Sequence, residues 1–403
     1  MRIAKGTLRD AYFHLSLFVL AISECIVMTN ESVGSSLNYA YFVSFTFLVW
    51  SLFVLRVFSR GYRFEFPSTT ILLFDMYFIW AIFITATVQP DPKITQYFLH
   101  IFWIALPFLV ANTVYYFTLH RGNNNLFHAD ITIIVAMLLY TYYEFYDVDN
   151  IVMGIHFGTS YYPFFLLPLI MVNRHVAVRV IGFLLVSIVL ISSVKRGGVM
   201  ALFAGTFVYI VVLQWIKGGR NILLKLSVVL LTVGVCAGLF IYLGTMGDNN
   251  IFERFENVEK DNGSGRVFVW GEAWRLIINQ NIAGFFIGHG YNAVVDASRY
   301  AFSAHNDYLE AWYDFGFIGV ALYVLAVFSM FIANLRAIIL RKPYAPAFSL
   351  LSTMFTILSM LSHIGIYYWM SFVMIDIAYF IGRMDYERRQ VFSITGREEH
   401  VEI

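Results

Sequence analysis

The 403-residue chain is more apolar and less charged than a soluble protein of its length. Hydrophobic residues make up 59% of it and charged residues 13%, about half of the charged fraction of soluble domains. The 27 Lys and Arg nearly balance the 26 Asp and Glu, which excludes the protein-wide positive field of a nucleic-acid binder. Cys25 and Cys236 lie far apart in apolar runs, as expected of small buried side chains and not of a disulfide or metal site.

Apolar runs long enough to cross a bilayer recur along the whole chain. A membrane span needs about 20 mostly apolar residues, and this criterion predicts about twelve helices. No repeat or linker divides the chain, so the expected fold is an all-α polytopic membrane protein with one domain, residues 1–403. The predicted spans are 12–29, 37–58, 68–88, 95–118, 128–146, 160–173, 176–194, 197–216, 222–245, 306–332, 346–363 and 366–383.

The basic residues predict how these spans are oriented. Of the 27 Lys and Arg, 19 fall at alternate connections that include both chain ends, and short cytoplasmic loops are enriched in such residues. Both termini are therefore expected in the cytoplasm. The longest connection, 246–305, is expected outside, where residues 265–279 have the apolar spacing of an amphipathic helix lying on the membrane surface.

A pair of cations marks one of the predicted outer turns. Lys195 and Arg196 lie between two apolar runs and are followed by Gly197 and Gly198. Two cations at a tight turn, beside glycines that permit close backbone approach, predict a phosphate-binding site at a helix N-terminus. Snorkelling of both side chains to lipid head groups is the alternative. Because the positive-inside rule is broken at this turn, we favour anion binding.

The predicted outer loop contributes two arginines and a histidine. Arg266 lies at the expected start of its helix and Arg275 nine positions later, so at about 100° per residue they face different directions. We expect Arg266 to face the site, and Arg275 to be either a second anion contact or an anchor to lipid head groups. His289, in the sequence GHGYN, either contacts sugar or phosphate or is a polar loop residue held by neighbouring backbone.

A second histidine closes the outer loop, directly before a span. His305 lies at the N-terminus of that predicted helix, where the positive end of the helix dipole favours the neutral imidazole that can act as a base. Asp307, Glu310 and Asp314 follow. One of these carboxylates could orient His305, but we expect at least two of them on a solvated face. His363, at the end of another span, is expected to line a cavity near the outer side.

The order of these motifs resembles a known family. HNDYLEAWYDFGFIG, from 305, is similar to the His-Asn-x-x-Leu and Gly-x-x-Gly signature of the O-antigen polymerase and O-antigen ligase family, the Wzy-like membrane glycosyltransferases. Upstream, Lys195-Arg196-Gly197-Gly198, then Gly-Ser-Gly-Arg ending at Arg266, then GHGYN at 288–292 follow in the family's order. The resemblance covers about residues 191–324. Lys195 departs from the serine that many relatives carry.

The resemblance implies an enzyme of GT-C-like type that needs no metal, cofactor or nucleotide sugar. Its substrates would be undecaprenyl-pyrophosphate-linked glycans, as donor and acceptor, at the periplasmic face of the bacterial inner membrane. Membrane lipid and a chain-length regulator are further expected partners, whereas nucleic acid is not. By resemblance, Arg196 and Arg266 would hold the pyrophosphate and His305 would assist the acceptor hydroxyl. Further substrate contacts would come from Lys195, Arg275, His289 and Asn306.

Three functions stay open at this point. The leading one is a polymerase of lipid-linked repeat units, because Lys195-Arg196 and the short, aromatic-rich loop resemble polymerases. A ligase that transfers the glycan to lipid A-core shares the chemistry and differs in its acceptor. A lipid-linked oligosaccharide transporter or flippase belongs to another class. Such carriers usually show repeat symmetry and polar residues at mid-membrane, whereas the distinctive polar residues here gather on one predicted face.

Overall fold

The computed structural model describes residues 51, 66–88, 94–121, 164–192, 196–218, 265–299, 301–365 and 370–398. Every regular element within these ranges is a helix, and none of these residues forms a strand. The helices are α3 (Thr69–Val88), α4 (Ile94–Arg121), α8 (Leu167–Met171), α9 (Val176–Ser192), α10 (Arg196–Lys217), α13 (Arg266–Asn279), α14 (Ile282–Ile287), α15 (Ala293–Ala297), α16 (Asp307–Ile339), α17 (Ala345–Leu361) and α18 (Met370–Glu398).

The described helices are those of a membrane protein. Within the described ranges, four segments are long and apolar enough to cross a bilayer: Thr69–Val88, His100–His120, Gly197–Lys217 and Asp307–Ile339. Helices α9 and α17 are apolar too, but each has 17 residues, slightly fewer than the roughly 20 that a span needs. The total of about twelve spans stays a prediction, because the runs 12–29, 128–146 and 222–245 and nearly all of 37–58 lie outside the described residues.

One predicted span has a different form. In the run 160–173, the helix α8 has only five residues, far too few to cross a membrane. Pro168 lies in the first turn of α8, where the N–H that proline lacks has no partner within the helix. In the interior of a longer helix, the same proline would remove one backbone hydrogen bond. Residues 167–170 are buried. The described part of this run, 164–173, is therefore largely buried and largely helical, with a turn at residue 166 before α8.

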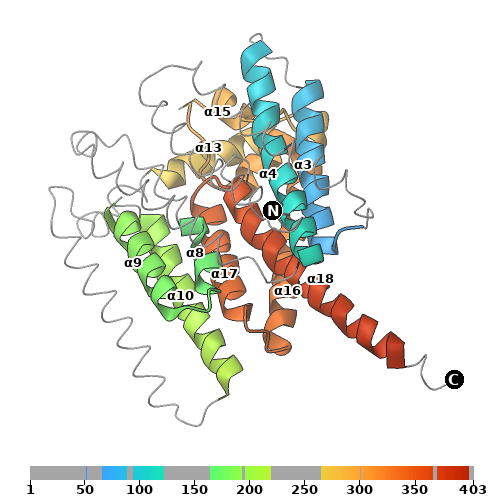
Figure 1. The fold of residues 1–403 in the computed structure, drawn as a ribbon. Coiled ribbons are helices and arrows are strands. Elements are labelled where there is room, and N and C mark those ends of the chain that lie inside the picture. The colour runs from blue at the N-terminus through green and yellow to red at the C-terminus, as the bar shows by residue number, and fades with distance from the viewer. Residues whose placement is uncertain are drawn as a thin grey trace, which may run out of the picture.

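The long helices lie side by side, with α16 near the middle (Figure 1). Helix α16 packs against α3 and α17, α18 packs along α4, and α10 packs along α17. The start of α10, the end of α17, the start of α16 and the short helices α13 and α15 lie toward the same end of the bundle, uppermost in Figure 1. We call this the site end. The end of α16, the start of α17 and the second half of α18 lie toward the other end, called here the opposite end.

A break in α16 brings the GHGYN loop against the bundle. Gly316 has φ 71° and ψ −177° within α16, and Gly288 has φ 93°. A Cβ on either glycine would lie closer than 3.0 Å to backbone of the other segment. The N–H groups of His289 and Gly290 donate to the carbonyl of Asp314 at 2.9 and 2.7 Å. Two glycines with left-handed backbone thus allow the loop to approach the helix closely.

Candidate functional site

The start of α16 holds His305 in a defined turn. Asn306 caps the helix, and its side-chain oxygen accepts from the N–H groups of Tyr308 and Leu309 at 3.0 and 3.2 Å. This is the hydrogen bonding expected of an asparagine N-cap. His305 precedes the cap with φ 50°, a backbone conformation that residues other than glycine adopt infrequently and that is enriched at functional sites.

Hydrogen bonds to a buried carboxylate fix that turn. The backbone N–H of His305 donates to Oγ of Ser303 at 3.1 Å and to Oε1 of Glu310 at 3.0 Å. The Ser303 hydroxyl donates to the same Glu310 oxygen. Glu310 is 1% exposed and Ser303 is buried. The two side chains therefore hold the backbone of His305 in the conformation that sets the direction of its side chain.

A second imidazole lies against the first. The rings of His305 and His363 stack with their centroids 4.5 Å apart and their planes 27° apart. Nδ1 of His363 lies 3.0 Å from Oγ of Ser303. Because the serine proton is given to Glu310, the remaining arrangement has Nδ1–H of His363 donating to Ser303. A carboxylate, a hydroxyl and two imidazoles thus form one continuous cluster.

The arginine predicted to bind pyrophosphate reaches the same region from α13. Arg266 is the first residue of α13 and follows Gly265, whose φ is 76°. Its Nε donates to the carbonyl oxygen of Leu361 at 3.1 Å, two residues before His363. The side-chain nitrogen of Asn306 lies 3.3 Å from the carbonyl oxygen of Met360. Arg266, His305 and Asn306, all predicted from sequence, therefore meet residues 360–363 at the end of α17.

The backbone of Arg196 approaches this region at the start of α10. Arg196 is the first residue of α10, whose start lies at the site end beside the end of α17 (Figure 1). Gly205 shows how closely the two helices pack, because a Cβ there would meet Leu350 and Met354 of α17 within 3.0 Å. Lys195 lies outside the described residues.

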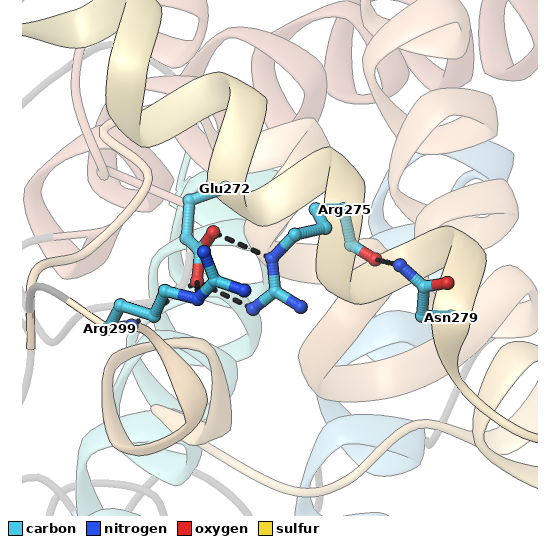
Figure 2. Close-up of polar contacts among 4 residues, drawn as sticks. All are labelled: Glu272, Arg275, Asn279 and Arg299. Carbon is cyan, nitrogen blue, oxygen red and sulfur yellow. Dashed lines mark hydrogen bonds and ion pairs between the residues drawn. The ribbon is translucent and has the colours of Figure 1, made fainter.

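Arg275 lies in an ion cluster on α13. Its Nε and Nη2 donate to the two carboxylate oxygens of Glu272 at 2.8 and 2.7 Å, and Nε of Arg299 lies 3.8 Å from Oε1 of Glu272 (Figure 2). The hydrogen bonds from Arg275 hold the pKa of Glu272 at about 2, below its ordinary value of 4.5. The same pairing raises the pKa of Arg275. This cluster joins α13 to the chain that follows α15, and a substrate contact through Arg275 stays a prediction.

His289 has neighbours other than His305. Its Nε2 lies 2.9 Å from the side-chain oxygen of Gln280, and its ring centroid lies 4.7 Å from that of Tyr313. Burial lowers the pKa of His289, which favours the neutral ring, and in that form one ring nitrogen donates a hydrogen bond while the other accepts one. Its predicted contact to sugar or phosphate stays a prediction.

The expectation that at least two of the α16 carboxylates lie on a solvated face is wrong. Asp307, Glu310 and Asp314 are each at most 1% exposed. Asp307 accepts from the N–H of Ile364 at 2.6 Å and from the hydroxyl of Tyr323 at 3.0 Å. The cost of burying each carboxylate is offset because the carboxylate accepts hydrogen bonds from N–H or O–H groups of a neighbouring segment.

Asp314 binds the loop that follows α14. Its two oxygens accept from the N–H groups of Asn292 and Val294, both at 2.9 Å. The first two turns of α16 thus fasten three segments, residues 292–294, 303–305 and 364, around the predicted site. Ser303 was not identified from sequence, and His363 was expected only to line a cavity. No local spacing relates residue 303 to residue 363.

Part of this site lies within a segment that matches a known family. No curated protein matches the chain. Residues 181–324 match the family model described as O-antigen ligase (Wzy_C), a range that contains α10, α13 to α15 and the start of α16. Arg196, Arg266 and His305 all fall within it. The match confirms the resemblance found in the sequence: this segment is similar to the family of O-antigen polymerases and ligases.

Proposed function

We propose that the chain is a membrane glycosyltransferase that polymerises undecaprenyl-pyrophosphate-linked oligosaccharide repeat units at the periplasmic face of the bacterial inner membrane. The observation that carries this proposal is the meeting of Arg266 and His305 at residues 361–363. A cation that can hold an anionic leaving group and an imidazole that can take a proton are the two groups that such a transfer needs.

The reaction we propose is a direct displacement at the anomeric carbon. The acceptor hydroxyl oxygen forms a bond to that carbon while the bond from the carbon to the pyrophosphate oxygen breaks. The hydroxyl proton passes to His305, and the pyrophosphate leaves with both bonding electrons. Arg266 and Arg196, with Lys195, neutralise the leaving group. Positioned proton transfer contributes about 10²–10⁴-fold to such a rate, and charge-assisted hydrogen bonds contribute about 1.5–3 kcal/mol each.

The buried cluster behind His305 supports this role. Glu310 and Ser303 hold the backbone of His305, and His363 supports its ring. A base that is held in place loses little entropy when the acceptor binds. We propose that these three are positioning residues and that the proton is taken by His305 itself.

The ligase is the second candidate. The description of the matching family favours it, and the chemistry at His305 and the arginines would be the same. We favour the polymerase because of the Lys195-Arg196 pair and the aromatic-rich loop. The acceptor alone distinguishes the two enzymes, so the acceptor has to be tested directly.

A reconstitution tests the proposal. Purified protein receives a synthetic undecaprenyl-pyrophosphate glycan and EDTA, without nucleotide sugar, and should lengthen the glycan by whole repeat units. If lengthening fails and added lipid A-core yields a conjugate, the ligase replaces the polymerase. If neither product forms but the lipid crosses liposomes, the protein is a transporter.

Cysteine labelling tests the proposed orientation in the membrane. A cysteine replacing Asn262 should react with an impermeant reagent from outside, and one replacing Lys342 only after permeabilisation.

A further inference from the structure

A cavity at the opposite end of the bundle carries charges that the proposed reaction does not use. It has a volume of about 600 Å³ and is bordered by the start of α3, by α4, by the second half of α16 and by α18. Arg336, Arg388 and Arg389 line it, with Asp385 as its one acidic lining residue. We call it the arginine pocket. The α16 residues of its lining lie in the second half of this helix, away from His305, which precedes the first turn.

The charges of the arginine pocket favour an anion. Asp385 accepts from the hydroxyl of Tyr115 at 2.9 Å, and Nη1 of Arg388 lies 3.9 Å from its other oxygen. Within the described part of the chain, Arg336 forms no ion pair. The lining itself thus contains three guanidinium groups and one carboxylate. A phosphodiester is the type of anion that guanidinium groups bind well.

The other wall of the pocket is apolar and faces outward. Leu325 and Phe328 line it and are 51% and 62% exposed, and both belong to the membrane-spanning part of α16. In a bilayer, such side chains lie against acyl chains. A soluble anion would use the arginines but would gain nothing from this wall, whereas a lipid would use both. The occupant that fits is therefore a lipid with an anionic head group.

We propose that the arginine pocket binds an anionic glycerophospholipid, with the phosphodiester at Arg336 and Arg388 and an acyl chain along Leu325 and Phe328. The proposal does not depend on the glycosyltransferase reaction. Basic pockets between membrane helices on the cytoplasmic side bind the head groups of anionic lipids. The pocket lies at the end where the sequence predicts the cytoplasm, because the basic residues on which that prediction rests include Arg336, Arg388 and Arg389 of its lining.

The test measures binding of fluorescent phosphatidylglycerol to the purified full-length protein in neutral detergent. Unlabelled phosphatidylglycerol should compete, whereas phosphatidylcholine and glycerol phosphate should compete at least tenfold more weakly. The double variant Arg336→Gln/Arg388→Gln should bind about 25-fold more weakly, about fivefold for each arginine. The matched control Arg174→Gln/Lys217→Gln removes two basic side chains outside the pocket and should bind as the wild type does.

Each other outcome overturns the proposal. Equal competition by glycerol phosphate would identify a soluble anion site, and equal competition by phosphatidylcholine would leave only apolar binding. An equal loss in the control variant would show diffuse charge attraction and no built site. Thermal unfolding in detergent checks that the double variant is folded. Arg388→Glu is the second variant, because this exposed side chain tolerates charge reversal, and it should weaken binding more than Arg388→Gln does.

Discussion

The two ends of the helix bundle use charged side chains in different ways. At the site end, Asp307, Glu310 and Asp314 are buried, and each accepts backbone N–H groups from another segment. At the opposite end, Glu387 is partly exposed and pairs with Lys342 at 2.7 Å and Arg383 at 3.4 Å. Removing a buried acceptor leaves donors without partners, whereas exposed ion pairs contribute little to stability. The site end is therefore where single substitutions should have large consequences.

The largest effect is expected at His305. His305→Ala should lower the rate of glycan extension about 10²–10⁴-fold, because proton transfer from the acceptor is lost while the arginines still hold the donor. The measurement is the initial rate of extension with the synthetic donor. The matched control is His175→Ala, which removes an exposed histidine before α9 and should leave the rate unchanged. Similar rates for the His305 variant and the wild type would remove this residue from the mechanism.

A second pair of variants compares the two ends directly. Asp314→Ala removes the acceptor for the N–H groups of Asn292 and Val294, and each stranded buried donor should cost about 1–3 kcal/mol. Glu387→Ala removes two ion pairs at the opposite end and should cost about 1 kcal/mol or less. Thermal unfolding in detergent measures both. Equal losses would mean that the buried carboxylates have no special role in stability.

The close approach of Gly288 and Gly316 gives a third prediction. Gly316→Ala should destabilise the fold by about 2–5 kcal/mol. Left-handed backbone costs alanine about 1–2 kcal/mol, and overpacking adds about 1–3 kcal/mol. Gly271→Ala is the matched control, because Gly271 lies inside α13 with no atom within 4 Å of its Cβ position. Its unfolding temperature should rise slightly, since alanine favours helix over glycine. A neutral Gly316→Ala would contradict the break in α16.

The sequence predicted the elements of this structure better than their contacts. Long apolar runs indicated the spans because a bilayer requires continuous apolar helices, and the histidine before a span indicated the start of α16. The spacing of Asp307, Glu310 and Asp314 places them on one helix face. This spacing fits a buried stripe as well as the solvated face that we expected. The pairing of Ser303 with His363 could not be predicted, because it depends on where α17 ends relative to α16.

The smallest predicted effect concerns the ion cluster on α13, and it depends on pH. The folded-state pKa of Glu272 is about 2, below the ordinary value of 4.5. The ionised carboxylate is therefore favoured by folding. Its stabilising contribution is complete above pH 4.5 and declines as pH falls from about 4.5 to about 2. Glu272→Gln should lower the unfolding temperature at pH 7, and its difference from the wild type should shrink through that acidic window.

The same cluster separates the two roles of Arg275. If Arg275 only joins α13 to the chain around Arg299 (Figure 2), Glu272→Gln and Arg275→Ala should lower the unfolding temperature similarly and leave extension rates close to the wild type. If Arg275 also contacts the pyrophosphate, Arg275→Ala alone should slow extension, by up to about tenfold for one partly exposed charge-assisted contact. Glu272→Gln then keeps the guanidinium available and should retain the rate. Because the two variants remove opposite partners of one ion pair, only a contact to substrate can make their rates differ while their unfolding temperatures agree.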